Sequence, residues 1–181
     1  MWTIKKKILY FLYRLTAAWL PISYHFPPAK RLRAFWCARI AAYCGRNVNV
    51  ETGAFFTPEL RIGDNSGLGA DCEMNGPVTI GDNVMMGPEV VAYTTRHRHD
   101  RTDIPMIRQG MDTPLPVTIG NDVWIGRRVM LMPGAVVGDG CVIGAGAVVV
   151  GEIPAWSVAV GVPAKVVKRR TPGEATVMPS E

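Results

Sequence analysis

Acidic residues are missing from the first 50 positions of this 181-residue chain, and no apolar run is long enough to cross a bilayer. Nine lysines and arginines precede the first acidic residue, Glu51, so the net charge of +5 is concentrated at the N-terminal end. A spanning helix needs about 20 apolar residues, but Arg14 interrupts the hydrophobic stretch at residues 8–21. A small-residue cleavage site is also missing, which argues against a secretory signal.

Cysteine and histidine are scarce, which excludes several kinds of metal site. The four cysteines form no Cys-x-x-Cys pair, and the chain has three histidines. We therefore expect reduced, buried thiols in a cytoplasmic protein and no metal site. Nineteen glycines and fourteen prolines are too many for a helical bundle, and they favour short strands joined by tight turns.

Apolar residues recur at every sixth position in two unbroken series. A helix would show spacings of three and four, and a strand would alternate, so neither explains this period. The residue after each apolar position is often Gly, and the residue four positions on is usually small or β-branched. Such a chain turns a corner every six residues and stacks its aliphatic side chains inside a triangular coil, with Gly or Asn at corners that accept a positive φ. The two series are Val50, Phe56, Ile62, Leu68, Met74, Ile80, Met86, Ala92 and Ile119, Ile125, Leu131, Val137, Ile143, Val149, Ala155.

The repeat [Leu/Ile/Val]-Gly-x-x-x-x resembles that of the hexapeptide-repeat transferases over about residues 45–170. The segments Pro116-Val-Thr-Ile-Gly-Asn-Asp-Val-Trp-Ile-Gly126 and Gly161-Val-Pro-Ala-Lys165 are similar to the galactoside, maltose and capsular-polysaccharide acetyltransferases. The resemblance implies an all-β fold, a single-stranded left-handed parallel β-helix. The left hand rests on the resemblance alone, because the general rule for crossovers favours right-handed connections.

The sequence divides into three parts. Residues 1–45 are predicted to form a basic, amphipathic helical cap, with a second helix at residues 29–43 ending at Gly45 as its C-cap. Residues 46–170 form the β-helix acyltransferase domain, and residues 171–181 are expected to be a flexible tail. Within the β-helix the six-residue period lapses, which predicts a protruding loop at residues 93–116.

The protruding loop contains the histidines His97 and His99. Transfer of an acetyl group from a thioester to a sugar hydroxyl needs a base, and a neutral imidazole can accept the hydroxyl proton. The resemblance places His97 on the catalytic histidine of the family, thirteen residues after Val84. His99 is the alternative base, although we interpret it as a solvated residue among arginines.

The remaining site residues are assigned chiefly through the resemblance. Acetyl-CoA is expected as donor in a groove between neighbouring copies of a homotrimer, and no metal is expected. Glu73, Asn75, Asp100 and Arg101 are candidates for binding the acceptor, although the spacing around Glu73 departs from the galactoside enzymes. The predicted donor-binding residues are Trp124, Gly126, Arg127, Ala145, Gly146 and Lys165.

The basic N-terminal module has two interpretations. Its helices would cap the first coil, and its lysines and aromatic residues in addition predict peripheral attachment of residues 1–28 to the inner face of an anionic membrane. The leading function is acetylation of a sugar or surface-polysaccharide precursor. The alternatives are a streptogramin- or chloramphenicol-type acetyltransferase and a non-catalytic β-helix scaffold. A γ-type carbonic anhydrase would need three coil histidines, and only His97 and His99 lie there; nucleic-acid binding lacks a motif.

Overall fold

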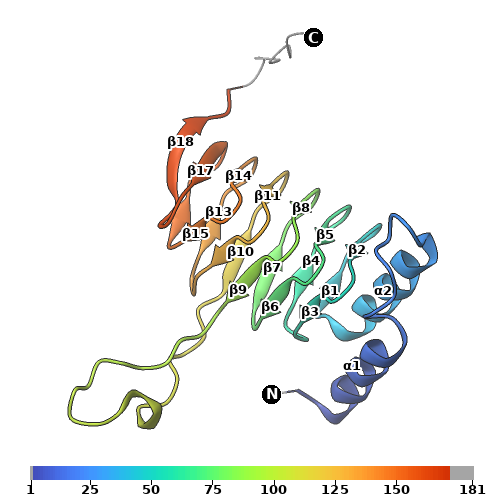
Figure 1. Ribbon diagram of the computed structural model, residues 1–181, viewed down its shortest axis with the longest axis horizontal. Helices are drawn as coiled ribbons and strands as arrows, with labels where there is room; N and C mark the ends of the chain where they lie inside the picture. Colours follow the sequence, from blue (N-terminus) through green and yellow to red (C-terminus); the bar gives the residue numbers. More distant parts are fainter. Residues whose placement is uncertain (1, 172–181) are drawn as a thin grey trace.

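The computed structural model describes residues 2–171 and shows a three-sided coil of short parallel strands with two helices at its N-terminal end (Figure 1). The predicted left-handed parallel β-helix with an N-terminal helical segment is therefore confirmed. The tail predicted at residues 171–181 lies outside the described residues from residue 172 onward. None of the helices in the described part of the chain is both long enough and apolar enough to cross a membrane.

Three sheets form the sides of the coil, and successive strands along the chain move from one sheet to the next. The first sheet contains β1 (Tyr43–Cys44), β4 (Arg61–Ile62), β7 (Val78–Ile80), β10 (Val117–Ile119), β13 (Val136–Val137) and β16 (Glu152–Ile153). The second contains β8 (Met85–Met86), β11 (Trp124–Ile125), β14 (Val142–Ile143), β17 (Ser157–Val160) and β18 (Lys165–Arg169), and the pair β2 (Asn49–Val50) and β5 (Gly67–Leu68) extends this side. The third contains β3 (Phe55–Phe56), β6 (Glu73–Asn75), β9 (Val91–Tyr93), β12 (Met130–Leu131) and β15 (Val148–Val149).

The strand register shows where the turns of the coil are regular and where they change length. Arg61 lies opposite Thr79, 18 residues later, which is three six-residue steps. Thr79 in turn pairs with Thr118, 39 residues on, because the predicted loop is inserted between β9 and β10. Val136 pairs with Glu152, so the last turn is two residues short. For this reason Ile153 takes the buried place predicted for Ala155, which is half-buried.

The interior of the coil is filled by the six-residue series. Every member is buried except Met86 and Ala155, which are half-buried. The small or β-branched residues four positions on are buried too. Each side of a turn therefore contributes two inward-facing apolar positions. These positions are covered only when the next turn stacks on them.

The recurring glycines serve close stacking of the turns rather than a positive φ, which corrects the predicted role of most of them. A Cβ on Gly63 would lie 2.6 Å from the Gly81 carbonyl oxygen of the next turn, and one on Gly87 would lie 2.7 Å from the Arg127 backbone nitrogen. The left-handed residue comes two positions later, as at Asn65 with φ 56°. Asn accepts this backbone region more readily than most residues do.

A ladder of carboxylate and amide oxygens runs along the corner between the first and second sheets. Asp64 accepts the backbone N–H of Arg46, Asp82 that of Asp64, and Asn121 that of Asp82, at 2.7–2.8 Å. Asp139 continues the ladder by accepting the N–H of Asn121 at 2.6 Å. These bonds satisfy corner N–H groups that no strand pairs.

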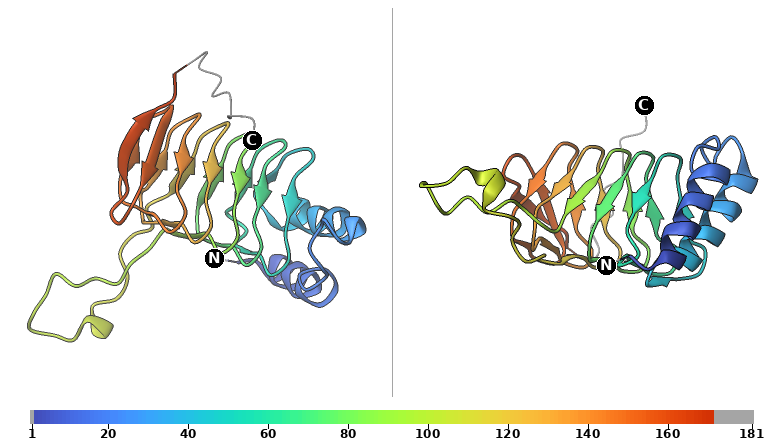
Figure 2. Two further views of the ribbon diagram at one scale, coloured as in Figure 1. Left: turned by 45° about the horizontal axis from the view of Figure 1, so that its top comes forward. Right: turned by 90° about the horizontal axis from the view of Figure 1, so that it is seen from below.

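Two helices cover the open first turn of the coil (Figure 2). Helix α1 (Ile4–Thr16) buries Tyr13, whose hydroxyl donates to the Ala54 oxygen at 2.9 Å. Helix α2 (Pro27–Ile40) begins with two prolines in its first turn, where a missing N–H costs nothing. It ends three residues before the predicted position, and its C-cap is Ala41 rather than Gly45. Gly45 serves close stacking instead, because a Cβ there would lie 2.7 Å from the Asp64 nitrogen of the next turn.

Arg33 of α2 fastens the helices to the coil. Its side chain is fully buried and donates to the Val50 oxygen at 2.5 Å and the Leu20 oxygen at 3.0 Å. It also forms an ion pair with Glu51 at 3.3 Å. Burial alone would raise the pKa of Glu51, but hydrogen bonds from Ser23 and Asn49 and the charge of Arg33 hold it below its usual value.

Replacing Arg33 should destabilise the fold, because the Arg33→Met variant leaves buried carbonyl oxygens and Glu51 without a partner. We expect the free energy of unfolding to fall by about 3 kcal/mol. Arg31→Met, an exposed position on the same helix, should change it by less than about 0.5 kcal/mol. Urea unfolding followed by circular dichroism measures the stability of both variants. Equal stability of the two variants would show that the buried contacts of Arg33 do not stabilise the fold.

Candidate functional site

The inserted segment forms an arm that leaves the corner between the third and first sheets (Figure 1). At its base the Leu115 N–H donates to the Thr94 oxygen at 2.7 Å. The Thr94 hydroxyl donates to the Asn75 oxygen of β6, also at 2.7 Å, and Thr94 is buried. These two hydrogen bonds hold the two ends of the arm together at the coil surface and link the arm to the neighbouring turn.

His97 lies in the paired part of the arm. It forms an antiparallel bridge with Met111, and the flanking bonds are Arg98 N–H to Gly110 oxygen at 3.0 Å and Asp112 N–H to Arg96 oxygen at 2.9 Å. The His97 side chain is exposed. Its backbone is therefore fixed while its imidazole remains accessible to a substrate.

His99, the alternative base, follows just outside this paired segment. Its Nδ1 lies 3.2 Å from the His97 oxygen, and its side chain is also exposed. The two imidazoles thus differ in the backbone that carries them, since His97 is bridged to the opposite strand of the arm and His99 is not.

Asp112 offsets part of the positive charge on either side of His97. Its carboxylate accepts from Arg96 at 2.8 Å and lies 3.4 Å from Arg98. The hydrogen bond from Arg96 holds the pKa of Asp112 below its usual value, so the group is ionised at neutral pH. Nothing in the sequence pattern pointed to Asp112, because it pairs with residues 16 and 14 positions away across the arm.

Asp100 and Arg101 line a polar cavity of about 450 Å³ in the arm. The arm also contains the short helix η1 (Met106–Arg108). The backbone N–H of Arg101 donates to Gln109, and the Gln109 amide donates back to the Arg101 oxygen at 2.8 Å. Arg101 also pairs with Asp103, and this lowers the pKa of the Asp103 carboxyl. The side chain of Arg101 is thus held at the tip by its own loop.

Glu73 and Asn75 lie in a different cavity, of about 400 Å³, on the third sheet. Asn75 donates to Glu73 at 3.3 Å. Arg14 and Trp19 from the N-terminal module line the same cavity, and no sequence motif pointed to them. The four predicted acceptor residues therefore belong to two separate cavities.

Four of the predicted donor-binding residues come together at the corner between the second and third sheets. The Gly126 N–H donates to the Ile143 oxygen and the Gly146 N–H to the Arg127 oxygen, both at 2.8 Å. A Cβ on Gly126 would lie 2.6 Å from the Ala145 nitrogen, so stacking requires this glycine. Ala145 and Gly146 are exposed, and among the described residues no atom beyond the two chain neighbours of Gly146 lies within 4 Å of the place that a Cβ on Gly146 would take.

Trp124 and Lys165 flank this corner on the second sheet. Trp124 is exposed and lies in register with Val142 of the next turn. Lys165 begins β18, opposite Val160. Further along β18, Arg169 donates to the Ala155 oxygen at 3.0 Å, so this basic residue also secures the final turn of the coil.

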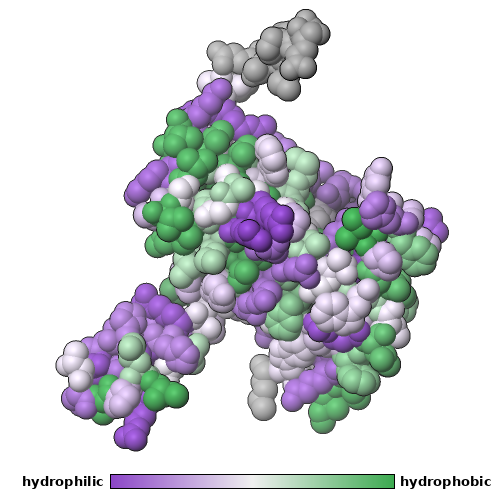
Figure 3. Space-filling model, viewed as in Figure 1, coloured by the Kyte–Doolittle hydropathy of each residue, from purple (hydrophilic) through white to green (hydrophobic). Residues whose placement is uncertain are grey.

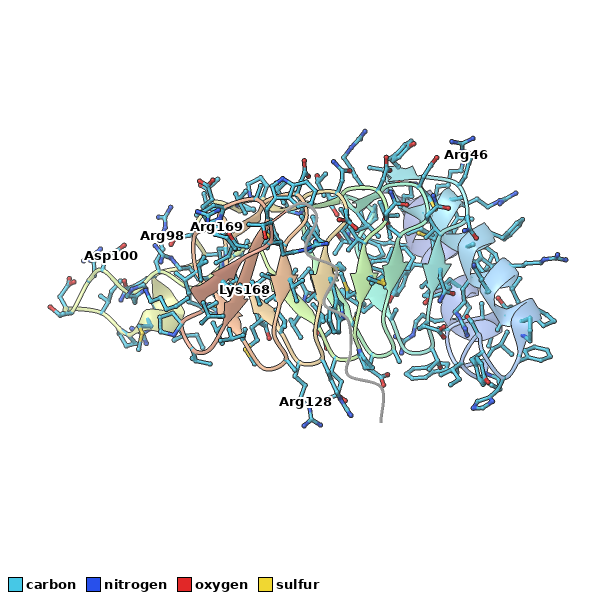
Figure 4. All side chains as sticks on the ribbon, turned by 90° about the horizontal axis from the view of Figure 1, so that it is seen from above. Arg46, Arg98, Asp100, Arg128, Lys168 and Arg169 are labelled. Carbon is cyan, nitrogen blue, oxygen red and sulfur yellow. The ribbon has the colours of Figure 1, made fainter. Side chains whose placement is uncertain are left out.

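Arg127 is paired rather than free. Arg127 and Arg128 both donate to Glu89 of the preceding turn, the latter at 2.6 Å, and these hydrogen bonds lower the pKa of the Glu89 carboxyl. Figure 4 shows Arg128 at one edge of the coil and Arg98 and Asp100 on the projecting arm. The arm that carries His97 leaves the coil at one corner, and the predicted donor-binding residues lie at another, with the third sheet between the two corners. Among residues 2–171, no group of three His, Cys, Asp or Glu side chains is placed to hold a metal ion.

Two family models match the coil. Residues 116–151 match "Bacterial transferase hexapeptide (six repeats)", and residues 59–87 match "Hexapeptide repeat of succinyl-transferase". Galactoside O-acetyltransferase of Escherichia coli strain K12 is 38% identical over 133 residues, which cover 70% of this chain and 63% of that protein. The chain spans less than two thirds of the length of this and other curated relatives that it matches.

Solved structures match over more of their length. A maltose O-acetyltransferase from Clostridium difficile 630 is 32% identical with a TM-score of 0.77, over 92% of this chain and 87% of that one. A galactoside acetyltransferase in complex with coenzyme A is 31% identical with a TM-score of 0.77, over 93% and 80% of the two chains. Because these relatives are more than 30% identical and are covered over at least 80% of their length, the chain belongs to the hexapeptide-repeat acetyltransferase family.

Proposed function

We propose that this protein is an acetyl-CoA-dependent O-acetyltransferase that acts on a sugar hydroxyl, with His97 as general base. The observation that carries the proposal is the position of His97, an exposed imidazole on a backbone fixed by the bridge to Met111. The galactoside enzyme bound to coenzyme A and the maltose enzyme support the donor and the class of acceptor. Among sugars, we propose a surface-polysaccharide precursor as the acceptor, because the membrane attachment proposed below would hold the enzyme at a membrane.

The reaction needs one proton transfer and one oxyanion. The imidazole takes the hydroxyl proton as the oxygen attacks the thioester carbonyl, and the thiolate of CoA leaves. A backbone N–H near the donor corner would stabilise the negative oxygen of the tetrahedral intermediate. Asp112 offsets part of the positive charge of Arg96 and Arg98 beside an imidazole that must become cationic.

The donor is proposed to lie along the corner that contains Ala145 and Gly146, where small exposed residues let pantetheine approach the backbone closely. Trp124 would cover the thioester end. Lys165 would pair with a phosphate of CoA.

We infer that the working unit is a homotrimer. Within one chain the third sheet separates the His97 arm from the donor corner, so a second copy is needed to bring the two together. The arm also ends in exposed apolar side chains, Met106 and Ile107, which a neighbouring copy would cover.

Removing the imidazole should abolish transfer without disturbing the coil, because the exposed His97 side chain makes no hydrogen bond or ion pair with another of residues 2–171. We expect His97→Ala to lower kcat by a factor of about 10²–10⁴ with an unchanged KM for acetyl-CoA. His99→Ala is the matched control and should retain most activity. The activity of wild type and both variants is measured as transfer of the acetyl group from radiolabelled acetyl-CoA to maltose, methyl galactoside and chloramphenicol.

The same assay separates the competing functions. Chloramphenicol as the best acceptor would favour an antibiotic acetyltransferase, and folded wild-type trimers without any transfer would favour a scaffold. Loss of activity in His99→Ala with an active His97→Ala would contradict the assignment of the base.

A second proposal concerns location: helix α1 attaches the enzyme to the inner face of an anionic membrane. The outward face of α1 carries large apolar side chains that the coil does not cover: Ile4, Ile8, Phe11 and Leu15 are 78%, 55%, 65% and 71% exposed. Figure 3 shows apolar side chains gathered over this end of the molecule. Exposed Lys5 and Lys7 flank them, with no acidic residue before Glu51, which suits anionic lipid headgroups. Lys6 is different, because it donates to the last carbonyls of α2 at 2.6–2.7 Å.

The double variant Ile8→Ser/Phe11→Ser should lose membrane binding while keeping its fold, since neither side chain is buried. We expect wild type to float with vesicles of phosphatidylglycerol and phosphatidylcholine, and the floated fraction to fall at least about tenfold in the variant. Val150→Ser/Val167→Ser, which removes apolar side chains that are 65% and 61% exposed at the far end of the coil, is the control. Equal flotation of all three proteins, or none in wild type, would refute the attachment.

A further inference from the structure

Cys44 differs from the other three cysteines of the chain in its exposure. Cys37, Cys72 and Cys141 are fully buried, as expected for reduced thiols, whereas Cys44 is half-buried. Cys44 lines a cavity of about 300 Å³ between helix α2 and the first turn of the coil. A small solute that enters this cavity reaches the residue from outside the protein, which no route to the interior of the coil allows.

Cys37 lies in the last turn of α2, against the inner side of Cys44. Ala34 and Ala38, three residues before Cys37 and one residue after it, line the same cavity as Cys44. The chain reverses between the two cysteines, because the Ala41 N–H donates to the Cys37 oxygen at 2.9 Å and Cys44 then enters β1. Their side chains meet, with the Cys37 thiol donating a hydrogen bond to the Cys44 sulfur.

This contact makes the two thiols chemically unequal. The hydrogen bond from Cys37 stabilises the Cys44 thiolate and holds the pKa of Cys44 below its usual value, although partial burial opposes this. The same hydrogen bond, together with burial, raises the pKa of Cys37 well above the ordinary range. At Cys72, burial raises the pKa to about 11. Cys44 is thus an accessible thiol that ionises readily, and a protonated thiol touches it from inside.

We propose that Cys44 is a peroxide-sensitive modification site and that Cys37 is its resolving cysteine. Accessible thiols with a second cysteine beside them are the usual form of such sites. The site lies in the helical cap and uses neither the arm nor the donor corner, so it is independent of the acetyl transfer proposed above. Its product, a Cys37–Cys44 disulfide, links α2 covalently to β1 one helical turn after Arg33.

The reaction has two steps. The Cys44 thiolate attacks one oxygen of hydrogen peroxide, the O–O bond breaks, and Cys44 becomes a sulfenic acid. The hydroxide that leaves takes up the proton that Cys44 released on ionising. The Cys37 sulfur then attacks the Cys44 sulfur, the S–O bond breaks, and the hydroxyl leaves with the Cys37 proton as water. Two thiols and one peroxide thus give one disulfide and two waters, and the peroxide receives the two electrons that the sulfurs lose.

Mass mapping of the oxidised wild-type chain tests the proposal directly. Trypsin cleaves after Arg39, which places the two cysteines in separate peptides, residues 34–39 and 40–46. After treatment with hydrogen peroxide, unfolding and alkylation without reductant, we expect these peptides to be joined and two hydrogens lighter than their sum. Cys72 and Cys141 are internal controls, whose alkylatable thiols should disappear at least about tenfold more slowly. Dithiothreitol should restore both thiols.

Two matched variants assign the roles of the cysteines. Cys37→Ser keeps a hydroxyl that can donate to the Cys44 sulfur but cannot form the disulfide, so Cys44 should remain a sulfenic acid that dimedone labels. Cys44→Ser removes the attacking thiol, so Cys37 should stay unlabelled by dimedone and fully alkylatable after peroxide. Both variants are first checked for wild-type circular dichroism, and the mapping of wild type is decisive without them.

Two results would overturn the proposal. If Cys37 and Cys44 in wild type lose alkylatable thiol no faster than Cys72 and Cys141, the cavity contains no peroxide-sensitive site. If dimedone labels Cys37 in Cys44→Ser as readily as it labels Cys44 in Cys37→Ser, the pair reacts without the assigned order, and Cys44 is not the attacking thiol.

Discussion

The close stacking of successive turns is the constraint on which this molecule depends. Most strands contain two or three residues, too few to be stable alone, so each is held by the turns before and after it. The corners can approach because glycines such as Gly63 and Gly87 leave room for the backbone of the next turn. Where a turn has no predecessor, the helices take over, and buried Arg33 fixes them there through the Val50 and Leu20 carbonyls.

A rigid coil can carry function at its corners without loss of stability. The inserted arm interrupts one corner, yet Thr118 still pairs with Thr79 as though the insertion were absent. The arm therefore projects from a scaffold whose register it does not disturb, and Thr94 anchors its base. The donor corner lies at the other edge of the third sheet, where Gly146 leaves the surface open. In the proposed homotrimer, these separate corners would become one site when copies of the chain assemble.

The coil could be predicted from the sequence because its period reports directly on the backbone. Each apolar residue at the six-residue step faces inward, and the lapse of the period located the arm. The prediction failed at Ala155, since a turn that loses two residues shifts the pattern by an amount that composition does not reveal. It also placed the end of the second helix too late, because Ala41 and Ala42 are good helix formers and the strand pairing of Tyr43 overrides them.

The candidate site was less predictable, because its contacts join residues distant in sequence. His97 and the donor-binding residues were assigned through the family resemblance and stay predictions, whereas Asp112, Glu89, Arg14 and Trp19 carry no local signal in the sequence. The N-terminal cap was predicted to be helical and amphipathic, yet the sequence alone could not tell that Ile8 and Phe11 face away from the coil while Tyr13 faces it. Which face of an amphipathic helix is buried depends on the partner surface, and here the coil accepts a narrow face of Tyr13 and small residues.

The claim that the active site forms between copies has one direct test, which is complementation between two inactive variants. His97→Ala lacks the base, and Ala145→Trp fills the donor corner with an exposed bulky side chain. Each variant alone should be inactive. Co-expressed with different tags and purified as mixed trimers, they should regain activity, at about a third of the wild-type level, because one of the three sites in each mixed trimer combines an intact His97 with an intact donor corner. Mixed trimers as inactive as either parent would contradict the account, because they would show that base and donor groove must belong to the same chain.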